Sequence, residues 1–139
     1  MNKKINVRDI TLDDYKFINQ WWIDNGDPIV PLKYLPNNGL GGVIAEVGKD
    51  KKLIAAAYLY QTDSAAAILN WGISDPNYKG RDRWEIGLAI INELERRAKA
   101  LGFDILQTWT FQKGLLKRYK DLGWTVADGQ WTILTKVIN

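Results

Sequence analysis

The sequence predicts an α/β (α+β) fold with a mixed, mostly antiparallel sheet of about seven strands flanked by helices. Three observations support this prediction. Segments 42–47, 53–61 and 65–74 have the composition of consecutive strands, and short polar turns join them, which indicates an antiparallel meander. A strand–helix–strand unit follows, and a hairpin signal lies near the end of the chain. Short connections of this kind favour one sheet covered by helices.

The composition is typical of a globular domain. The chain has 139 residues, 46% hydrophobic and 25% charged, and this length fits a single domain over residues 1–139. It contains no Cys and no His, which excludes disulfides, Cys-based zinc sites and His-dependent catalytic triads. The apolar runs are too short to span a membrane, and the first residues lack a signal-peptide core. We therefore expect a cytoplasmic protein without membrane association.

The charge balance is mildly basic. The formal net charge is +3 and the isoelectric point is about 9.1. A phosphorylated cofactor, an acidic substrate or a nucleic acid would each suit that sign. No helix pattern carries a basic stripe with base-reading residues, and the seven Trp are spread over most elements, as core residues are. Nucleic-acid binding is therefore the weakest of the functional hypotheses.

The first half of the chain predicts a strand, a helix and a long loop. Residues 5–8 alternate apolar and polar positions, which is typical of a half-buried strand. A capping-box-like start at 11–14 precedes a helix to about Asp24, and Gly26 ends it. Residues 25–42 are rich in turn formers, and a loop of this length usually binds something or covers a site. Its apolar residues also fit a short helical turn packed on the core.

The second half contains the clearest helix. Apolar residues recur at helical spacing from Trp84 to Leu101, and Gly102 follows as the cap. A strand over 103–110 and a short helix over 112–122 come next. Two further strands, 124–126 and 131–138, flank Asp128-Gly129, which is the strongest two-residue hairpin signal in the chain.

The segment between the fourth strand and the long helix carries a candidate anion site. Residues 78–83 read Tyr-Lys-Gly-Arg-Asp-Arg, directly before the helix. They place fixed positive charge and free backbone N–H groups at a helix start, which is the arrangement that holds a phosphate or pyrophosphate.

The order of elements and several motifs resemble the N-acetyltransferase superfamily abbreviated GNAT. Ser74-Asp75-Pro76 matches the turn after the family's fourth strand, and Lys79-Gly80 matches the Arg-Gly that often opens its pyrophosphate loop. Tyr119 and Gly123 match the family's Tyr-x-x-x-Gly pattern. The sequence departs from the family at Asp82 and Trp84, which stand where small residues are expected.

The resemblance implies a GNAT-like acyltransferase that moves an acetyl group from acetyl-coenzyme A to a primary amine of a small molecule or peptide. Tyr119 would then protonate the departing thiolate, since a phenol with a pKa near 10 is a plausible acid toward a thiolate whose thiol titrates near 8.5. On spacing alone, packing of the Tyr119 ring on its helix face is the better explanation, and only the surrounding match brings the catalytic role level with it. The residues implied to contact the cofactor are Ile73, Ser74, Asp75, Lys79, Gly80, Arg81, Asp82, Arg83, Trp84 and Gln112.

Two features keep a second function open. Asp82 adds negative charge and Trp84 adds bulk beside a bound pyrophosphate, for which Lys79, Arg81 and Arg83 would have to compensate. The fourth strand contains no carboxylate to act as a general base. The candidates elsewhere are Glu46, Asp63, Asp75 and Glu85, and none of them is compelling. The alternative is therefore a catalytically inactive binding or regulatory module on the same fold.

Three further expectations complete the prediction. Gly72 would permit a bulge or a close approach in the fourth strand. No metal site is expected. The sequence allows a monomer or a homodimer, because the last strand could be an edge that pairs with a second copy.

Overall fold

The computed structural model describes residues 3–110, 113–127 and 133–138. The chain divides into two units, Met1–Thr108 and Trp109–Asn139. The assignment of residues 1–139 to a single domain stays a prediction.

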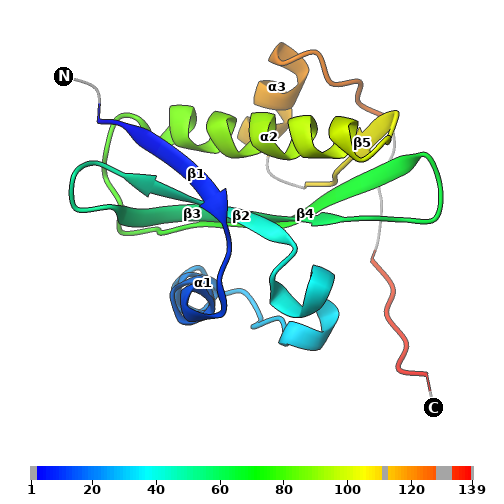
Figure 1. Ribbon diagram of the computed structural model, residues 1–139, viewed down its shortest axis with the longest axis horizontal. Helices are drawn as coiled ribbons and strands as arrows, with labels where there is room; N and C mark the ends of the chain where they lie inside the picture. The colour runs from blue at the N-terminus through cyan, green and yellow to red at the C-terminus, as the bar shows by residue number, and fades with distance from the viewer. Residues whose placement is uncertain (1–2, 111–112, 128–132, 139) are drawn as a thin grey trace. The chain divides into compact units, whose positions relative to one another are not determined.

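The first unit is built on a five-stranded sheet in the order β1-β2-β3-β4-β5 (Figure 1). Neighbouring strands are antiparallel except for β4 and β5, which are parallel. The predicted mixed, mostly antiparallel sheet is therefore confirmed. The strands are β1 (Ile5–Asp9), β2 (Gly42–Val47), β3 (Lys52–Tyr60), β4 (Ala66–Ser74) and β5 (Ile105–Gln107).

The predicted number of about seven strands is wrong. Residues 124–127 and 133–138, where the last two strands were expected, have no strand in the structure. Asp128, Gly129 and Trp131 lie outside the described residues. A turn signal specifies how a hairpin reverses but supplies no partner for it, and an isolated two-stranded hairpin is only marginally stable in water.

Helices cover both faces of the sheet (Figure 1). Helix α1 (Tyr15–Asp24) lies on one face together with two short 3-10 turns, Leu32–Tyr34 and Pro36–Gly39. These turns confirm that the predicted loop over 25–42 contains short helical turns. Helix α2 (Arg83–Ala100) covers the opposite face and confirms the predicted long helix.

The core follows from this layering. Strand β2 is buried along nearly its whole length because it has α1 on one side and α2 on the other. On the α1 face, Trp22, Ile44 and Tyr58 are almost fully buried in one apolar cluster. On the α2 helix, Leu94 is fully buried. Helix and strand periodicities thus agree in directing apolar side chains to the sheet.

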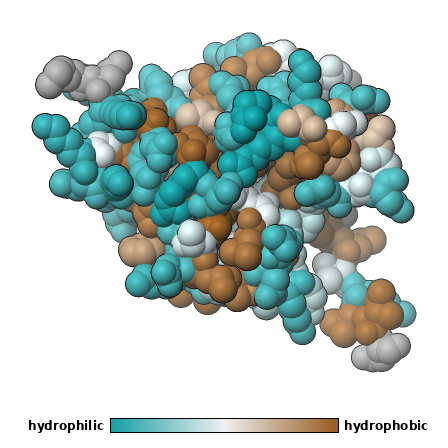
Figure 2. All heavy atoms as spheres, viewed as in Figure 1, coloured by the Kyte–Doolittle hydropathy of each residue, from teal (hydrophilic) through white to brown (hydrophobic). Residues whose placement is uncertain are grey.

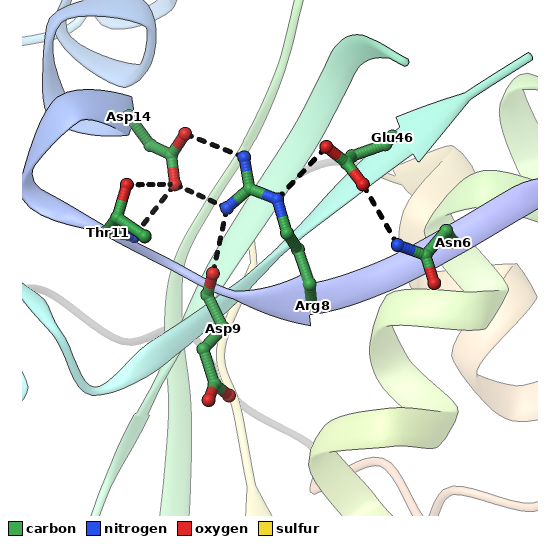
Figure 3. A network of polar contacts seen from close by, with 6 residues as sticks. All are labelled: Asn6, Arg8, Asp9, Thr11, Asp14 and Glu46. Atoms are coloured by element: carbon green, nitrogen blue, oxygen red, sulfur yellow. Dashed lines mark hydrogen bonds and ion pairs between the residues drawn. The ribbon is translucent and has the colours of Figure 1, made fainter. Parts of the chain in front are cut away.

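One polar network ties the first strand to the first helix (Figure 3). The guanidinium of Arg8 donates to both carboxylate oxygens of Asp14, at 2.7 and 2.9 Å, and its Nε lies 3.1 Å from Glu46. The Thr11 N–H also donates to Asp14, at 2.7 Å, and completes the predicted capping box. Only 5% of the Asp14 side chain is exposed. The network therefore links β1, β2 and the start of α1.

These contacts also lower the pKa of both carboxyl groups. Burial alone would raise the pKa of Asp14, but the hydrogen bonds from Arg8 and Thr11 outweigh it and hold the pKa below its usual value. Hydrogen bonds from Asn6 and Arg8 lower the pKa of Glu46. Both groups are therefore more easily ionised in the folded chain than in the unfolded chain.

The second unit contains α3 (Lys113–Asp121), which confirms the predicted short helix. Gly123 follows with a φ of 90°, a left-handed conformation that suits the residue after a helix end. Beyond it, four apolar side chains are 75–91% exposed. They are Ile133, Leu134, Val137 and Ile138. Figure 2 shows exposed apolar surface on the stretch of chain near the C-terminus.

We predict that Asp14→Asn lowers the free energy of unfolding at pH 7 by about 2–3 kcal/mol, because it removes the carboxylate that accepts two hydrogen bonds from the partly buried Arg8. Urea denaturation measures this difference. A carboxyl group with a lowered folded pKa stabilises the fold above its unfolded pKa, and this contribution disappears as the pH falls through the folded value. The variant should therefore lose less stability than the parent between pH 5 and about pH 2.

Asp13→Asn is the matched control for this prediction. Asp13 is the exposed neighbour of Asp14 in the same turn. Its replacement should change the free energy of unfolding by less than about 0.5 kcal/mol. Equal effects of the two substitutions at pH 7 would contradict a structural role for the Arg8 network.

Candidate functional site

Strands β4 and β5 pair over a short distance and then separate. Their parallel pairing joins Ala66 to Ile105 and ends where Ile68 meets Gln107. From residue 69 to 74, β4 continues beside β3 alone in the described part of the chain. Its backbone groups on the β5 side therefore lack a ladder partner there. Ligands favour such openings at the carboxyl ends of parallel strands.

A bulge interrupts β4 in this same stretch. Ala56 of β3 pairs with Ile73, whereas Tyr58 pairs with Asn70, so two residues of β4 lie opposite one of β3. The extra residue falls at 71–72, and the bulge expected beside Gly72 is confirmed. Trp71 has a φ of 55°, which is a rare conformation for a bulky side chain.

Arg83 braces the loop that follows β4. Its guanidinium donates to the Ser74 Oγ at 2.7 Å and to the backbone carbonyls of Asp75 and Tyr78 at 3.0 and 2.9 Å. These bonds tie the first residue of α2 back to the end of β4. They occupy part of the donor capacity that the sequence assigns to anion binding.

Tyr78 and Asp82 close the loop over Gly80. The buried Tyr78 hydroxyl donates to the Asp82 carboxylate at 2.6 Å. This bond and burial raise the pKa of Tyr78 to about 12. A Cβ on Gly80 would collide with the Tyr78 hydroxyl and with Asp82, so only glycine fits beneath the link. The sequence predicts that Asp82 adds an unpaired negative charge beside a bound pyrophosphate. In the structure the Asp82 carboxylate accepts a hydrogen bond from Tyr78 instead.

The remaining positive charge of the loop faces solvent. Lys79 is exposed and its Nζ lies 3.2 Å from the Pro76 carbonyl. Arg81 is exposed and has no hydrogen bond or ion pair among the described residues. Helix α2 starts at Arg83, and its first N–H groups have no acceptor within the helix. Side-chain cations and backbone donors thus occur together at residues 79–85, as an anion site requires.

The structure gathers most of the predicted cofactor residues on one segment. Residues 73–84 run from the end of β4 through the braced loop into α2, with Trp84 half-buried in the first helical turn. Gln112 lies outside the described residues. Sequence reasoning missed Tyr78, although a Tyr and an Asp four residues apart around a Gly are visible in the sequence.

Tyr119 belongs to the second unit, on α3. Its side chain is buried, and its ring meets the Trp124 ring edge-on at a centroid distance of 4.8 Å. The backbone N–H of Trp124 donates to the backbone carbonyl of Tyr119 at 3.0 Å. This packing fixes the ring within its unit, and the catalytic role of Tyr119 stays a prediction.

Among the described residues we find no metal site and no carboxylate that stands out as a general base. They contain no group of three or more His, Cys, Asp or Glu side chains that could hold a metal ion. Glu46 is engaged by Arg8 and Asn6, and Asp75 accepts the Asn77 N–H at 2.9 Å, so neither stands out as a base. Over the same residues, no helix has the length and hydrophobicity needed to cross a bilayer.

We predict that Gly80→Ala lowers the free energy of unfolding by about 1–2 kcal/mol, because the new methyl group must displace the Tyr78–Asp82 hydrogen bond. Gly87→Ala is the matched control. Gly87 lies inside α2, and a Cβ there meets nothing within 4 Å. That substitution should stabilise the protein by about 0.5–1 kcal/mol through helix propensity. Urea denaturation compares the two, and effects of the same sign would contradict the closed loop.

The fold is similar to those of several solved proteins, two of which are acetyltransferases. An acetyltransferase from Trypanosoma brucei matches with a TM-score of 0.66 at 15% identity, over 95% of this chain and 100% of that chain. Glucosamine-6-phosphate N-acetyltransferase from Arabidopsis thaliana matches with a TM-score of 0.66 at 12% identity, over 96% and 99% of the two chains. The Mycobacterium tuberculosis protein Rv2747, solved in complex with CoA and NLQ, matches with a TM-score of 0.69 at 21% identity, over 92% and 76%.

Sequence comparison alone finds no such relation. No protein-family model matches the sequence, and no curated protein matches it. The likeness therefore lies in the arrangement of the elements, and it extends over nearly the whole chain at identities of 12–21%. The chain has a divergent form of the GNAT acetyltransferase fold.

Proposed function

We propose that the protein is an acyltransferase that moves an acetyl group from acetyl-coenzyme A to a primary amine by direct transfer. The observation that carries this proposal is the separation of β4 from β5 immediately before a cationic loop at the start of α2. A nucleotide with a long, flexible acyl arm needs both features: an anion site for its phosphates and an open strand edge for the arm.

The loop suits a pyrophosphate despite its departures from the family pattern. Arg83 and the Tyr78–Asp82 hydrogen bond hold it in shape without a ligand, so little ordering cost remains when an anion binds. The Tyr78 hydroxyl donates to the carboxylate that would otherwise repel the phosphates most directly. In this proposal Lys79, Arg81 and the first N–H groups of α2 bind the pyrophosphate.

The acyl arm would lie along the open edge of β4. Residues 69–74 present backbone N–H and C=O groups there, and the amide groups of the arm need such partners. The arm would run from the loop at Ser74 back toward the bulge at 71–72. This direction brings the thioester to the irregular part of the strand, where the close approach of a second substrate is easiest.

The reaction itself requires few protein groups. The neutral amine nitrogen attacks the thioester carbonyl carbon, the new C–N bond forms, and the C–S bond breaks. The amine loses a proton to a base or to water, and the departing thiolate gains one. Tyr119 is the proposed donor of that second proton. Orientation of the two substrates supplies much of the acceleration.

A binding module on the same fold is the second candidate. It is favoured by Arg83, whose guanidinium donors serve the loop itself, and by the absence of a carboxylate on β4. Such a module would bind a partner and transfer no acyl group. Acetyl transfer to any amine would exclude it.

We predict that acetyl-coenzyme A binds and that Arg81→Ala raises its Kd about tenfold, because one charge-assisted contact to phosphate contributes about 1.5 kcal/mol. Isothermal titration calorimetry measures both affinities. Lys49→Ala is the control, since Lys49 is an exposed cation in the turn between β2 and β3. The Kd of the Lys49→Ala variant for acetyl-coenzyme A should match that of the parent. An absence of binding at millimolar ligand would contradict the proposed function.

Tyr119→Phe should lower kcat at least tenfold while the Kd for acetyl-coenzyme A stays within about twofold, because the hydroxyl acts only as the thiolate forms. Steady-state release of coenzyme A gives kcat, and calorimetry gives the Kd. The buried ring is retained in this variant, so its packing on Trp124 is a built-in control. An unchanged kcat would remove Tyr119 from the mechanism and leave it as a packing residue.

A further inference from the structure

Trp71 is held in a conformation that bulky residues rarely adopt. Four non-glycine residues among those described have a positive φ, and the other three are Asn37, Asn38 and Lys51. Those three lie in turns, whereas Trp71 lies within a strand. Such a backbone costs on the order of 1–3 kcal/mol, and residues of this kind cluster at functional sites. The strain therefore invites a functional explanation.

The surroundings of Trp71 fix its indole in one orientation. Its ring meets the Trp22 ring edge-on at a centroid distance of 6.5 Å. This contact holds the indole against α1, while the bulge fixes the backbone of Trp71 within β4.

The indole nevertheless remains accessible. Trp71 is 37% exposed, although its ring packs on the core residue Trp22. Most of the surface of an indole is aromatic carbon. An oriented, accessible aromatic surface of this kind is suited to stacking against an apolar or aromatic group.

The bulge determines where this surface lies. In a regular strand, position 71 would face away from the side that Asn70 shares with Tyr58. The extra residue turns Trp71 onto the α1 side, where Trp22 contacts it. The same residue lies on the stretch of β4 that has no β5 partner, three positions before Ser74. A donor arm laid along that edge would bring its thioester beside the indole.

The absence of acidic side chains from β4 restricts the class of amine that this site would accept. Strand β4 contains no Asp or Glu from residue 66 to 74, so a polyamine would find no carboxylate on it. An amine with one ammonium group and an aromatic body has two favourable contacts instead. Its ring stacks on the indole, and its ammonium form is attracted to an aromatic face before deprotonation.

We propose that Trp71 determines the acceptor of the reaction and that the acceptor is a primary monoamine carried on an aromatic body. This inference rests on the proposed function for the transfer step, but the binding of the amine is independent of it. Trp71 acts here as a specificity-determining residue that contacts the substrate. It donates and accepts no proton in the reaction.

The first test measures amine binding without coenzyme A. Phenethylamine and spermidine are titrated into the full chain and followed by ligand-observed NMR. We expect phenethylamine to bind at least about tenfold more tightly, from stacking and cation–π contacts together. Trp71→Asn should abolish this preference, since Asn tolerates a positive φ and removes the aromatic surface together with its contact to Trp22. Trp109→Asn is the control, because Trp109 is also exposed and lies in the second unit.

The second test measures acetyl transfer to the same two amines. The parent should show a kcat/KM for phenethylamine at least about tenfold above that for spermidine, and Trp71→Asn should not. Trp71→Met, which keeps apolar bulk without an aromatic face, serves if the Asn variant fails to fold. Equal use of both amines by the parent, or a preference retained in a folded Asn or Met variant, would overturn the inference. Phenethylamine binding without acetyl-coenzyme A binding would overturn the proposed function and leave the aromatic site standing.

Discussion

The parallel pairing of β4 with β5 covers three residue pairs and ends at Ile68 and Gln107. The proposed binding of the acyl arm along β4 depends on this early end of the pairing. β5 contains only three residues, whereas β4 contains nine, so among the described residues β3 is the only strand that pairs with the last six residues of β4. The bulge at 71–72 adds local twist to the same stretch. Backbone groups that a longer β5 would have paired are left for a ligand.

Side chains of the loop at the end of β4 engage the negative charge that Asp82 places beside the proposed phosphate site. A glycine-rich loop would hold phosphates through bare amides, but Asp82 adds a negative charge at that place. The Tyr78 hydroxyl donates to this carboxylate, and Gly80 leaves the space that the bond needs. The Arg83 guanidinium donates hydrogen bonds to the loop carbonyls. These donors hold the loop in shape and are not available to a ligand, so Lys79 and Arg81 are the exposed cations that remain for anion binding.

Local patterns predicted the architecture well, whereas contacts between distant residues escaped them. The meander of β2 to β4 and the helix α2 follow from periodicity and from turn residues, which are visible over short windows. Basic residues directly before a helix located the candidate anion loop at 78–83, and a glycine within a strand suggested a bulge at Gly72. The Arg8–Asp14–Glu46 network joins side chains up to 38 positions apart, from Arg8 to Glu46, and no local pattern signals it. The hairpin over 124–138 was predicted from turn chemistry alone, which cannot supply the partner strand that a hairpin needs.

Hydrogen exchange of the full chain with and without acetyl-coenzyme A tests the central claim most directly. If the open edge of β4 and the start of α2 hold the cofactor, amide protons of residues 69–74 and 83–85 should exchange at least about tenfold more slowly with saturating ligand. The amides of β2, which are already paired on both sides, should change little. Protection confined to other parts of the chain, or none at saturating ligand, would contradict the account.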